Sequence, residues 1–304
     1  MASYCVAAAF LAGCGGPGAT SVTPEPAAQS GASVTRAPSA KSWMRPDARR
    51  NNLLYVSYFY GNEVFAYSYP SGKLVGTLTG IPEAQGMCTA KNLKGKWWVV
   101  ATGSNQVFEY AHGGTSPLAT LDITAGAPAS CAVDPTTGNL AVTMITNDNV
   151  VVYKNGSGSP VTYTAPFGPY YSAYDKRGDL FVDGSGQTSL AELPKGGATF
   201  EPITANQTII FAAGLQWHGN DLAVGDLDTS TIYQFSITAS SATLTTTTPL
   251  SGAGSGDFWI QKNHVIASGG ADVGIWKFPA GGSPQKTFPG SFYGAVDVVM
   301  STVK

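Results

Sequence analysis

The chain has 304 residues, of which 43% are hydrophobic and 11% aromatic, enough for a substantial core and too many for a disordered chain. Only 12% of the residues are charged and 37 are glycine, a composition that favours short strands and tight turns over helices. The formal net charge of -2 argues against a general nucleic-acid-binding protein, and we expect no nucleic acid partner.

Residues 1–14 have the pattern of a targeting segment. The run SYCVAAAFLAGC is apolar but too short to span a bilayer. Its end, Leu11-Ala12-Gly13-Cys14, resembles the bacterial lipobox, in which the cysteine is lipidated and becomes the mature N-terminus. No Lys or Arg stands near the start, as a signal peptide normally requires, so the alternative is an apolar disordered tail. The resemblance implies an exported lipoprotein, anchored through Cys14, that faces the periplasm or the cell exterior.

Residues 15–51 are predicted to be a flexible tether. The segment begins with a run rich in Gly, Pro, Ala, Ser and Thr, and this run has no apolar period. The globular part is therefore predicted at 52–304.

From Asn52 onward the sequence repeats with a period of about 40 residues. Six apolar, strand-like cores mark the repeat, at 54–56, 97–100, 140–142, 180–182, 222–224 and 265–267. After each core come a polar turn, a strand of alternating side chains such as EVFAYSY or NVVVYKN, a Gly/Pro/Ser hairpin in most copies, and a third strand. A further strand precedes every core except the first, and GAVDVV at 294–299 is left over at the C-terminal end.

This arrangement predicts an all-β fold, a six-bladed β-propeller with four-stranded blades, whose first blade is closed by the C-terminal strand. The sequence CAVDPTTGNLAV followed by NVVVYKNG resembles the NHL-repeat and gluconolactonase-like propellers, and the likeness extends over nearly all of 52–304. The resemblance implies the fold more strongly than an activity, because this fold hosts hydrolases, lyases and pure binding platforms. We expect a monomer.

Cys88 and Cys131 occupy the same place in the second and third repeats. Equivalent positions on neighbouring inner strands lie close together, since these strands converge on the central channel. In an oxidising compartment this predicts a Cys88–Cys131 disulfide, and two small buried hydrophobic residues are the alternative. A zinc site is not expected, because no further Cys or His partner stands nearby.

We define the top face as the one at which each innermost strand begins and the bottom face as the one at which it ends. Alternating strand direction then assigns every loop to a face. The basic residues in or beside predicted bottom loops are Lys73, Lys91, Lys94, Lys96, Lys154, Lys176, Arg177, Lys195, Lys262, Lys277 and Lys304, with Lys286 in an outer strand. Arg45, Arg49 and Arg50 precede the ring on the same side, so we expect the tether to leave from a basic bottom face that anionic headgroups would attract.

The predicted top loops carry carboxylates and aromatic rings instead. They hold Glu63, Glu83, Asp122, Asp148, Asp183, Asp226, Asp228, Asp257 and Asp272, together with Tyr58, Phe59, Tyr60, Tyr170, Tyr171, Phe211, Phe258, Phe292 and Tyr293. Such a face suits a neutral or cationic ligand, for example a sugar or a divalent ion. The predicted ligand-binding residues are Tyr58, Tyr60, Glu83, Tyr170, Tyr171, Asp226, Asp257 and Tyr293. The alternative is that the aspartates form turns and the rings cap the core.

Three functional hypotheses follow, and the first is favoured: a lipid-anchored binding or scaffold protein that presents its top face to a small molecule or a protein, without a cofactor. The second is a metal-dependent, lactonase-like hydrolase, implied by the resemblance, in which a divalent cation on Glu83, Asn147, Asp183 and Asp226 would activate water. The third is a lyase. It needs a general base, but His112, His218 and His264 all map to predicted bottom loops. The sequence contains no G-x-S-x-G, Walker or H-E-x-x-H motif.

Overall fold

The computed structural model describes residues 41–184, 189–252, 257–268, 272–288 and 294–303. The chain divides into two compact units, Met1–Ala37 and Pro38–Lys304. The first unit, and with it the predicted lipidation site Cys14, lies outside the described residues, as do Phe292, Tyr293 and Lys304. The description below concerns the second unit alone.

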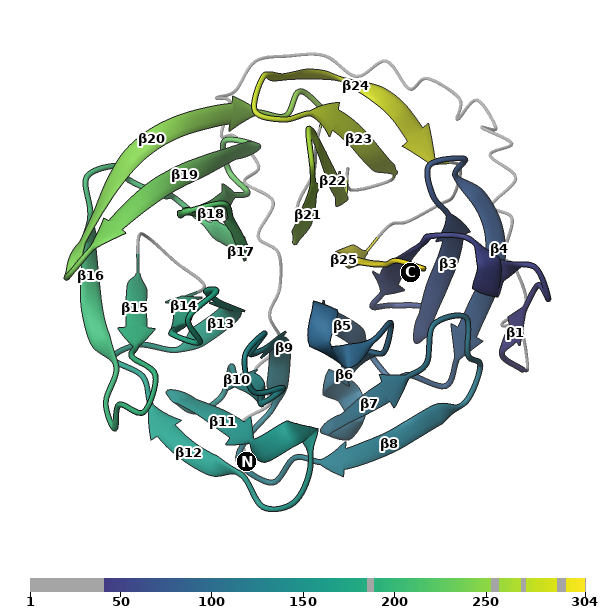
Figure 1. Ribbon diagram of the computed structural model, residues 1–304, viewed down its shortest axis with the longest axis horizontal. Helices are drawn as coiled ribbons and strands as arrows, with labels where there is room; N and C mark the ends of the chain where they lie inside the picture. The colour runs from purple at the N-terminus through teal and green to yellow at the C-terminus, as the bar shows by residue number, and fades with distance from the viewer. Residues whose placement is uncertain (1–40, 185–188, 253–256, 269–271, 289–293, 304) are drawn as a thin grey trace, which may run out of the picture. The chain divides into compact units, whose positions relative to one another are not determined.

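The described strands of this unit form five hydrogen-bonded sheets arranged around a central axis (Figure 1). The first sheet has the order β1-β4-β3-β2-β25 and contains β1 (Trp43–Met44), β2 (Leu53–Tyr58), β3 (Glu63–Ser68), β4 (Lys73–Thr79) and β25 (Ala295–Ser301). The second contains β5 (Ala84–Thr89), β6 (Trp97–Ala101), β7 (Gln106–Tyr110) and β8 (Pro117–Asp122). The third contains β9 (Pro128–Val133), β10 (Leu140–Met144), β11 (Asn149–Tyr153) and β12 (Val161–Thr164).

An eight-stranded sheet and a last four-stranded sheet complete the described unit. The eight-stranded sheet contains β13 (Pro169–Tyr174), β14 (Leu180–Gly184), β15 (Leu190–Leu193), β16 (Glu201–Ala205), β17 (Ala212–His218), β18 (Asp221–Asp226), β19 (Thr231–Thr238) and β20 (Ser241–Pro249). The last sheet contains β21 (Phe258–Gln261), β22 (His264–Ser268), β23 (Val273–Lys277) and β24 (Gly281–Phe288). Short 3-10 helices are η1 (Ala48–Arg50), η2 (Lys91–Leu93), η3 (Thr102–Ser104) and η4 (Lys154–Gly156).

The eight-stranded sheet consists of two antiparallel four-stranded halves. They are joined only where β16 and β20 pair in parallel, through Thr204↔Ser241 and Ala205↔Ala242. Each half has the same inner-to-outer strand order as the four-stranded sheets. The six strands nearest the axis are β5, β9, β13, β17, β21 and β25 (Figure 1).

The core lies between neighbouring groups of strands, because successive side chains of a strand point to opposite sides. In β2, for example, Tyr55 packs toward the second sheet, against Trp97 with ring centroids 4.1 Å apart. Leu54 and Val56 on the same strand pack toward the last sheet, with Ile266. Both faces of each inner strand pair are thus buried, which is why these strands are almost continuously apolar.

The C-terminal strand completes the first sheet. β25 pairs with β2 through Leu54↔Met300 and Val56↔Val298, so the two ends of the described fold are joined by a full ladder. This is the pairing expected for the strand left over at 294–299. It closes the ring without any covalent link.

The fold begins earlier in the chain than the sequence predicts, and this changes where the chain reaches the ring. Trp43–Met44, within the predicted tether of 15–51, forms β1 and pairs antiparallel with β4. Ser42 Oγ accepts from the amide of Thr79 at the top end of β4, and the two hydroxyls are 3.5 Å apart. The helix η1, which follows β1, lies near Gly113 at the bottom face. The chain therefore reaches the ring at the top face, and the expectation that the tether leaves from the bottom face is wrong. The reason is the extra outer strand β1, which is antiparallel to β4 and leads the chain from the top face to the bottom face before β2 begins.

Candidate functional site

The innermost strands contain an irregularity at equivalent positions. The pairing register shifts in β5, β9, β13, β17 and β25, as expected for a β-bulge, which leaves a backbone amide without its ladder partner. In three strand groups a side chain of the second strand accepts a hydrogen bond from the freed amide. The acceptors are Ser57 for the amide of Asp297, Thr143 for that of Ser130 and Asp183 for that of Tyr171, at 3.0, 3.1 and 2.9 Å.

Below these bulges the inner strands enclose a cavity of about 370 Å³. Its walls are formed by residues of β5, β9, β13, β17, β21 and β25, so each of the six inner strands contributes to it. Its rim includes the exposed residues Lys91, Pro135, Lys176 and Gly219, which follow the ends of inner strands. The cavity therefore opens on the bottom face, opposite the predicted top-face site.

The inner end of the cavity carries two buried carboxyl groups, Asp257 (8% exposed) and Asp297 (1% exposed). Asp257 precedes β21 and accepts a bond from the amide of Phe258 at 2.8 Å, while the amide of Met87 donates to Asp297 Oδ2. The amide of Asp257 donates to the carbonyl of Val296 at 2.7 Å, so the two aspartates lie on adjoining inner strands. Room for Asp257 exists because residue 214 is glycine: a Cβ there would lie 2.0 Å from Asp257 Oδ1.

Burial changes the protonation of this pair. It raises the pKa of Asp297 to about 8, and burial together with the nearby Asp297 raises the pKa of Asp257 well above its ordinary value. Within the described residues, neither carboxylate forms an ion pair. At pH 7 the pair therefore retains protons, unless a positive charge from outside the protein stabilises the ionised form.

The cavity wall is aromatic and contains polar atoms that lack partners. Tyr174, Trp217 and Trp259 line it. The hydroxyl of Ser172, a residue that is 6% exposed, and the indole Nε1 of Trp217 are buried, and neither has a hydrogen-bond partner among the described residues. Buried polar groups are normally hydrogen-bonded, so these two atoms indicate a place where a ligand or water completes the bonding.

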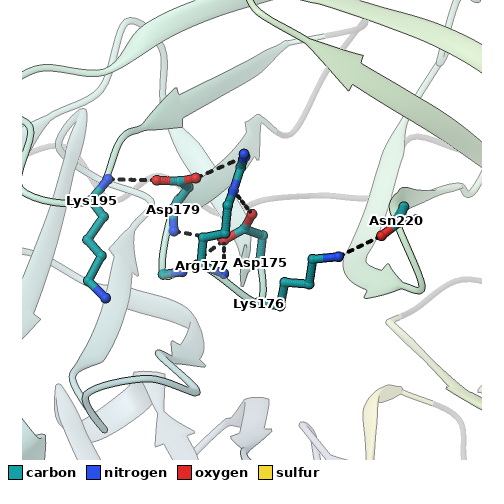
Figure 2. Close-up of polar contacts among 7 residues, drawn as sticks. Asp175, Lys176, Arg177, Asp179, Lys195 and Asn220 are labelled. Atoms are coloured by element: carbon teal, nitrogen blue, oxygen red, sulfur yellow. Dashed lines mark hydrogen bonds and ion pairs between the residues drawn. The ribbon is translucent and has the colours of Figure 1, made fainter.

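The loop after β13 positions the charges at the rim (Figure 2). Asp175 accepts from the amides of Arg177, Gly178 and Asp179 at 2.7, 2.8 and 3.0 Å. The Arg177 guanidinium bridges the carboxylates of Asp175 and Asp179 at 2.9 and 3.0 Å, as Figure 2 shows. Lys176 points instead to Asn220 Oδ1, at 2.7 Å, which holds its ammonium group at the rim. Arg177 is thus neutralised, and Lys176 remains a cation at the mouth.

Two of the predicted ligand-binding residues, Tyr170 and Tyr171, lie together on β13. The amide side chain of Gln85 on β5 donates to the hydroxyl of Tyr170 on β13, and Thr102 donates to Gln85 Oε1 at 2.6 Å. Tyr171 is buried against Tyr170, with ring centroids 4.8 Å apart, and burial raises its pKa well above the ordinary value. The Gln85–Tyr170 bond thus connects β5 with β13, two inner strands that are not neighbours in the ring.

The other predicted ligand-binding residues are spread over separate turns, except Asp257. Tyr58 stacks on Phe65, Tyr60 is 69% exposed, and the amide of Glu83 is held by Asn62 at 2.7 Å in a left-handed turn. Asp226 accepts from the amides of Ile210, Phe211 and Asp228, which is the turn-forming alternative. Tyr293 lies outside the described residues. The structure therefore brings Tyr170, Tyr171 and Asp257 together and leaves Tyr58, Tyr60, Glu83 and Asp226 apart.

The candidate metal ligands and general bases do not converge either. Asn147 donates to the carbonyl of Ala125 at 2.6 Å, and Asp183 and Asp226 hold backbone amides as described. Within the described residues, no group of three or more His, Cys, Asp or Glu side chains could hold a metal ion. His112 bridges Ser301 and Asn51, His218 packs on Phe278, and His264 begins β22. None of these imidazoles lines the cavity.

The bottom face is less basic than the sequence predicts, because it also carries carboxylates. Lys96 pairs with Glu109 at 2.6 Å, and Arg177 pairs with Asp175 and Asp179. Lys286 donates to the carbonyls of Pro70 and Ser71, so it too reaches a bottom turn. The face carries both signs of charge.

A disulfide joins Cys88 on β5 to Cys131 on β9, with an S–S distance of 2.04 Å and a Cα–Cα distance of 5.6 Å. Both residues line the cavity. The bond ties two neighbouring inner strands together across the bottom half of the channel, as the matched spacing predicts.

Sequence reasoning missed Asp297, Ser172, Trp217 and Trp259. A signal for Asp297 was present, because GDFWIQ and GAVDVV, the last two inner-strand sequences of the chain, both contain an aspartate. Nothing in the sequence distinguishes Trp217 or Trp259 from a core residue, since both belong to apolar inner strands.

Comparison with known proteins supports the fold. No protein-family model matches the chain, and no curated protein sequence matches it. A chain of the crystal structure of a nidogen/laminin complex is similar, with a TM-score of 0.70, 11% identity, and coverage of 84% of this chain and 100% of that one. The β-propeller domain of Myceliophteria thermophila Cps50 (Swd1) is also similar, with a TM-score of 0.57, 13% identity, and coverage of 81% and 85%. The chain has a β-propeller fold. In the part of the chain that the structure describes, no helix is long and apolar enough to cross a bilayer.

Proposed function

We propose that this chain is a binding protein whose site is the channel cavity on the bottom face, and that its ligand is a small neutral or cationic molecule. The observation that supports this most directly is the buried Ser172 hydroxyl without a partner, on the wall of a 370 Å³ cavity that also holds two carboxyl groups. Ligand sites are typically cavities of this size, with a mainly apolar and aromatic lining and few polar groups.

We also infer that the propeller has six blades. Six hydrophobic clusters are present, and each lies between two neighbouring groups of strands. Three of them lie between the first and second sheets, the second and third sheets, and the third sheet and β13–β16. The other three lie between β13–β16 and β17–β20, between β17–β20 and the last sheet, and between the last sheet and the first. The two halves of the eight-stranded sheet then count as two blades, joined at their outer edges by β16 and β20. The resemblance to NHL-repeat and gluconolactonase-like propellers agrees with this count.

The test compares two alanine-to-tryptophan variants. Ala90→Trp would fill the rim of the cavity, whereas Ala127→Trp, at an equally half-buried alanine on the top face, leaves it open. Saturation-transfer NMR with hexylamine and methyl glucoside should show saturable binding of at least one compound to the wild type and to Ala127→Trp. Binding should be lost in Ala90→Trp. If neither compound binds the wild type, or if Ala90→Trp binds like the wild type, the cavity is not the site.

A protein partner on the top face is a second candidate. Tyr60, Ile145, Ile210 and Phe211 are exposed hydrophobic residues in loops of that face. The similar chain reported above comes from a crystal structure of a nidogen/laminin complex, so a fold of this kind occurs within a protein–protein complex. Phe211→Ser should then weaken capture of a partner found by cross-linking, while Leu118→Ser, at an exposed residue of the outer strand β8, should not. Equal capture by both variants would exclude the top face.

Membrane anchoring through Cys14 also remains a proposal, supported by the lipobox-like Leu11-Ala12-Gly13-Cys14 alone. In a bacterial host, Cys14→Ser should move the protein from the membrane fraction to the soluble fraction. Equal membrane recovery of both forms would overturn it. The metal-dependent lactonase alternative has no support from the described side chains, since its candidate ligands do not converge.

A further inference from the structure

We propose that the cavity binds a small zwitterion with a primary ammonium group, which lies against Asp257 and Asp297 while its acidic group lies toward Lys91 and Lys176. This inference rests on the proposed function, because it names the class of ligand for the same cavity. All four side chains line that cavity, the aspartates at its inner end and the lysines at its rim.

The inner end presents hydrogen-bond acceptors for an ammonium group. Asp257 Oδ1 accepts the amide of Phe258, and Asp297 accepts the amides of Met87 and Val298. A carboxylate can accept at about four positions in all, so both groups keep acceptor capacity. The hydroxyl of Ser172, also at the inner end, has no partner within the described residues. Two carboxylates and one hydroxyl match the three N–H donors of a primary ammonium group. A quaternary ammonium group has no donor and would leave all three acceptors unpaired.

The protein supplies no positive charge to the buried pair. Neither aspartate forms an ion pair in the described structure, although an ionised carboxylate is costly to bury without a partner. A ligand cation would provide that partner. The rings of Tyr174, Trp217 and Trp259 on the wall favour a cation further, since the face of an aromatic ring attracts positive charge.

The rim favours the opposite charge. The bulges of β5 and β13 lie at Gly86 and Tyr171, and Asp297 occupies the same level in β25. Lys91 and Lys176 each follow five residues after the bulge of their strand. β5 ends at Thr89 and β13 at Tyr174, so these five residues span less than about 16 Å, the advance of a continuous strand. The flexible Lys91 side chain can shorten the distance further, while Lys176 stays at the rim beside Asn220. A tripeptide, at about 10 Å when extended, has the length to place its carboxylate near the lysines.

Binding should release a proton. Burial raises the pKa of Asp297 to about 8, so an ammonium ion that needs the carboxylate displaces a proton below that pH. The other titratable or charged groups facing the pair or the cavity are Lys91, Tyr170, Tyr171, Tyr174, Asp175, Lys176 and Asp183. Burial raises the pKa of Asp183 to about 7, but Asp183 does not line the cavity. Replacing Asp297 therefore separates the proton released by Asp297 from any proton released by Asp183.

The experiment uses four forms of one probe: triglycine, N-acetyl-triglycine, triglycine amide and N-trimethyl-triglycine. Affinity is measured by calorimetry on the full chain. Triglycine should bind best, and acetylation or trimethylation of its amine should weaken binding about tenfold or more, because donors are lost at buried acceptors. Amidation of its carboxylate should weaken binding less, about threefold, because the lysines are exposed to solvent. From pH 6 to pH 7 the affinity for triglycine should rise about tenfold for each proton released.

Matched variants locate the effect. Asp297→Asn should weaken triglycine about tenfold, leave N-acetyl-triglycine unchanged and flatten the pH dependence. Asp226→Asn, at a buried aspartate that holds turn amides away from the cavity, should bind triglycine like the wild type. Unfolding curves of both variants show whether they are folded during the measurement.

Two results would overturn the inference. If N-acetyl-triglycine binds as tightly as triglycine, the ammonium group is not recognised, while the cavity stands as a site. If none of the four compounds binds at millimolar concentration, the zwitterion is excluded, and the hexylamine and methyl glucoside titrations then decide the proposed function separately.

Discussion

Aspartates that look alike in the sequence have two different roles in this molecule. Asp134, Asp175 and Asp226 each accept several hydrogen bonds from the amides or hydroxyls of a turn. Asp257 accepts one amide, Asp297 accepts two, from Met87 and Val298, and both carboxyl groups face a cavity. The first role uses up the carboxylate, and the second leaves acceptor capacity for a ligand. This difference separates the aspartates that hold turns from the two that face the cavity.

The buried pair should weaken the fold as pH rises. The folded-state pKa of Asp297, raised by burial to about 8, exceeds the unfolded value, so the folded state binds the proton more tightly. The stability contributed by that proton is therefore present at low pH and is lost between about pH 4 and pH 8. Asp297→Asn should raise the free energy of unfolding at pH 8 by on the order of 2 kcal/mol and reduce this loss. Urea titrations at pH 5 and pH 8 measure it; an unchanged pH dependence would contradict the placement of Asp297.

The disulfide between Cys88 and Cys131 gives a second prediction at this scale. It closes a loop with a sequence separation of 43, for which chain entropy gives a stabilisation of about 4 kcal/mol. In a chain beginning at Lys41, thiol titration after unfolding without reductant should find no reactive thiol. The paired change Cys88→Ala and Cys131→Ala should lower the free energy of unfolding by about 2 to 4 kcal/mol. Two titratable thiols in the oxidised protein would contradict the bond.

Among the elements, the loop after β9 stands out because one side chain organises it. Asp134 accepts from the amide of Thr136 at 2.7 Å and from the hydroxyls of Thr136 and Thr137. The pKa of Asp134 lies below its ordinary value. Burial alone would raise this pKa, but the hydrogen bonds from Thr137 and Thr136 stabilise the ionised carboxylate and outweigh burial. The turn is thus stabilised above the unfolded-state pKa and loses that stabilisation as the pH falls further.

Asp134→Ala should therefore lower the free energy of unfolding at pH 7 by about 1 to 2 kcal/mol, with less effect near pH 3. The matched control is Asp122→Ala on the exposed strand β8, whose carboxylate accepts one bond, from Gln106, and which should cost less than about 1 kcal/mol. Thermal unfolding at both pH values makes the comparison. An equal loss at pH 3 and pH 7 would show that the turn does not depend on the ionised carboxylate.

The sequence predicted the repeating elements well but not the outermost strand or the site. The cores at 54–56, 97–100 and 140–142 lie in β2, β6 and β10, because strands buried on both faces must be apolar and the chain repeats them. Trp43–Met44 was missed, since two residues carry no periodic signal. Tyr170 and Tyr171 were expected to line a site on the top face, but they contact each other, and Tyr170 bonds to Gln85 of β5. Ring orientation depends on packing across the ring of strands, which no local sequence pattern encodes.

On the scale of the whole molecule, stability should depend on the pairing of β25 with β2. The groups of strands around the axis are held by contacts between neighbours, so an opened ring exposes two apolar faces at once. A chain that ends at Gly294 should lose the cooperative unfolding transition, while a chain that begins at Lys41 should keep it, because it retains all described strands. Differential scanning calorimetry distinguishes them. Two equal transitions would show that the fold does not need the closing strand.

The most direct test of the cavity as the functional site is an NMR titration of the six tryptophan indole groups with triglycine. Trp217 and Trp259 line the cavity, whereas Trp97 and Trp276 lie in the core between strand groups. The Nε1–H signals of Trp217 and Trp259 should shift in a saturable way with a common dissociation constant, and those of Trp97 and Trp276 should stay in place. Saturable binding with no shift at Trp217 or Trp259 would place the site outside the cavity and contradict the account.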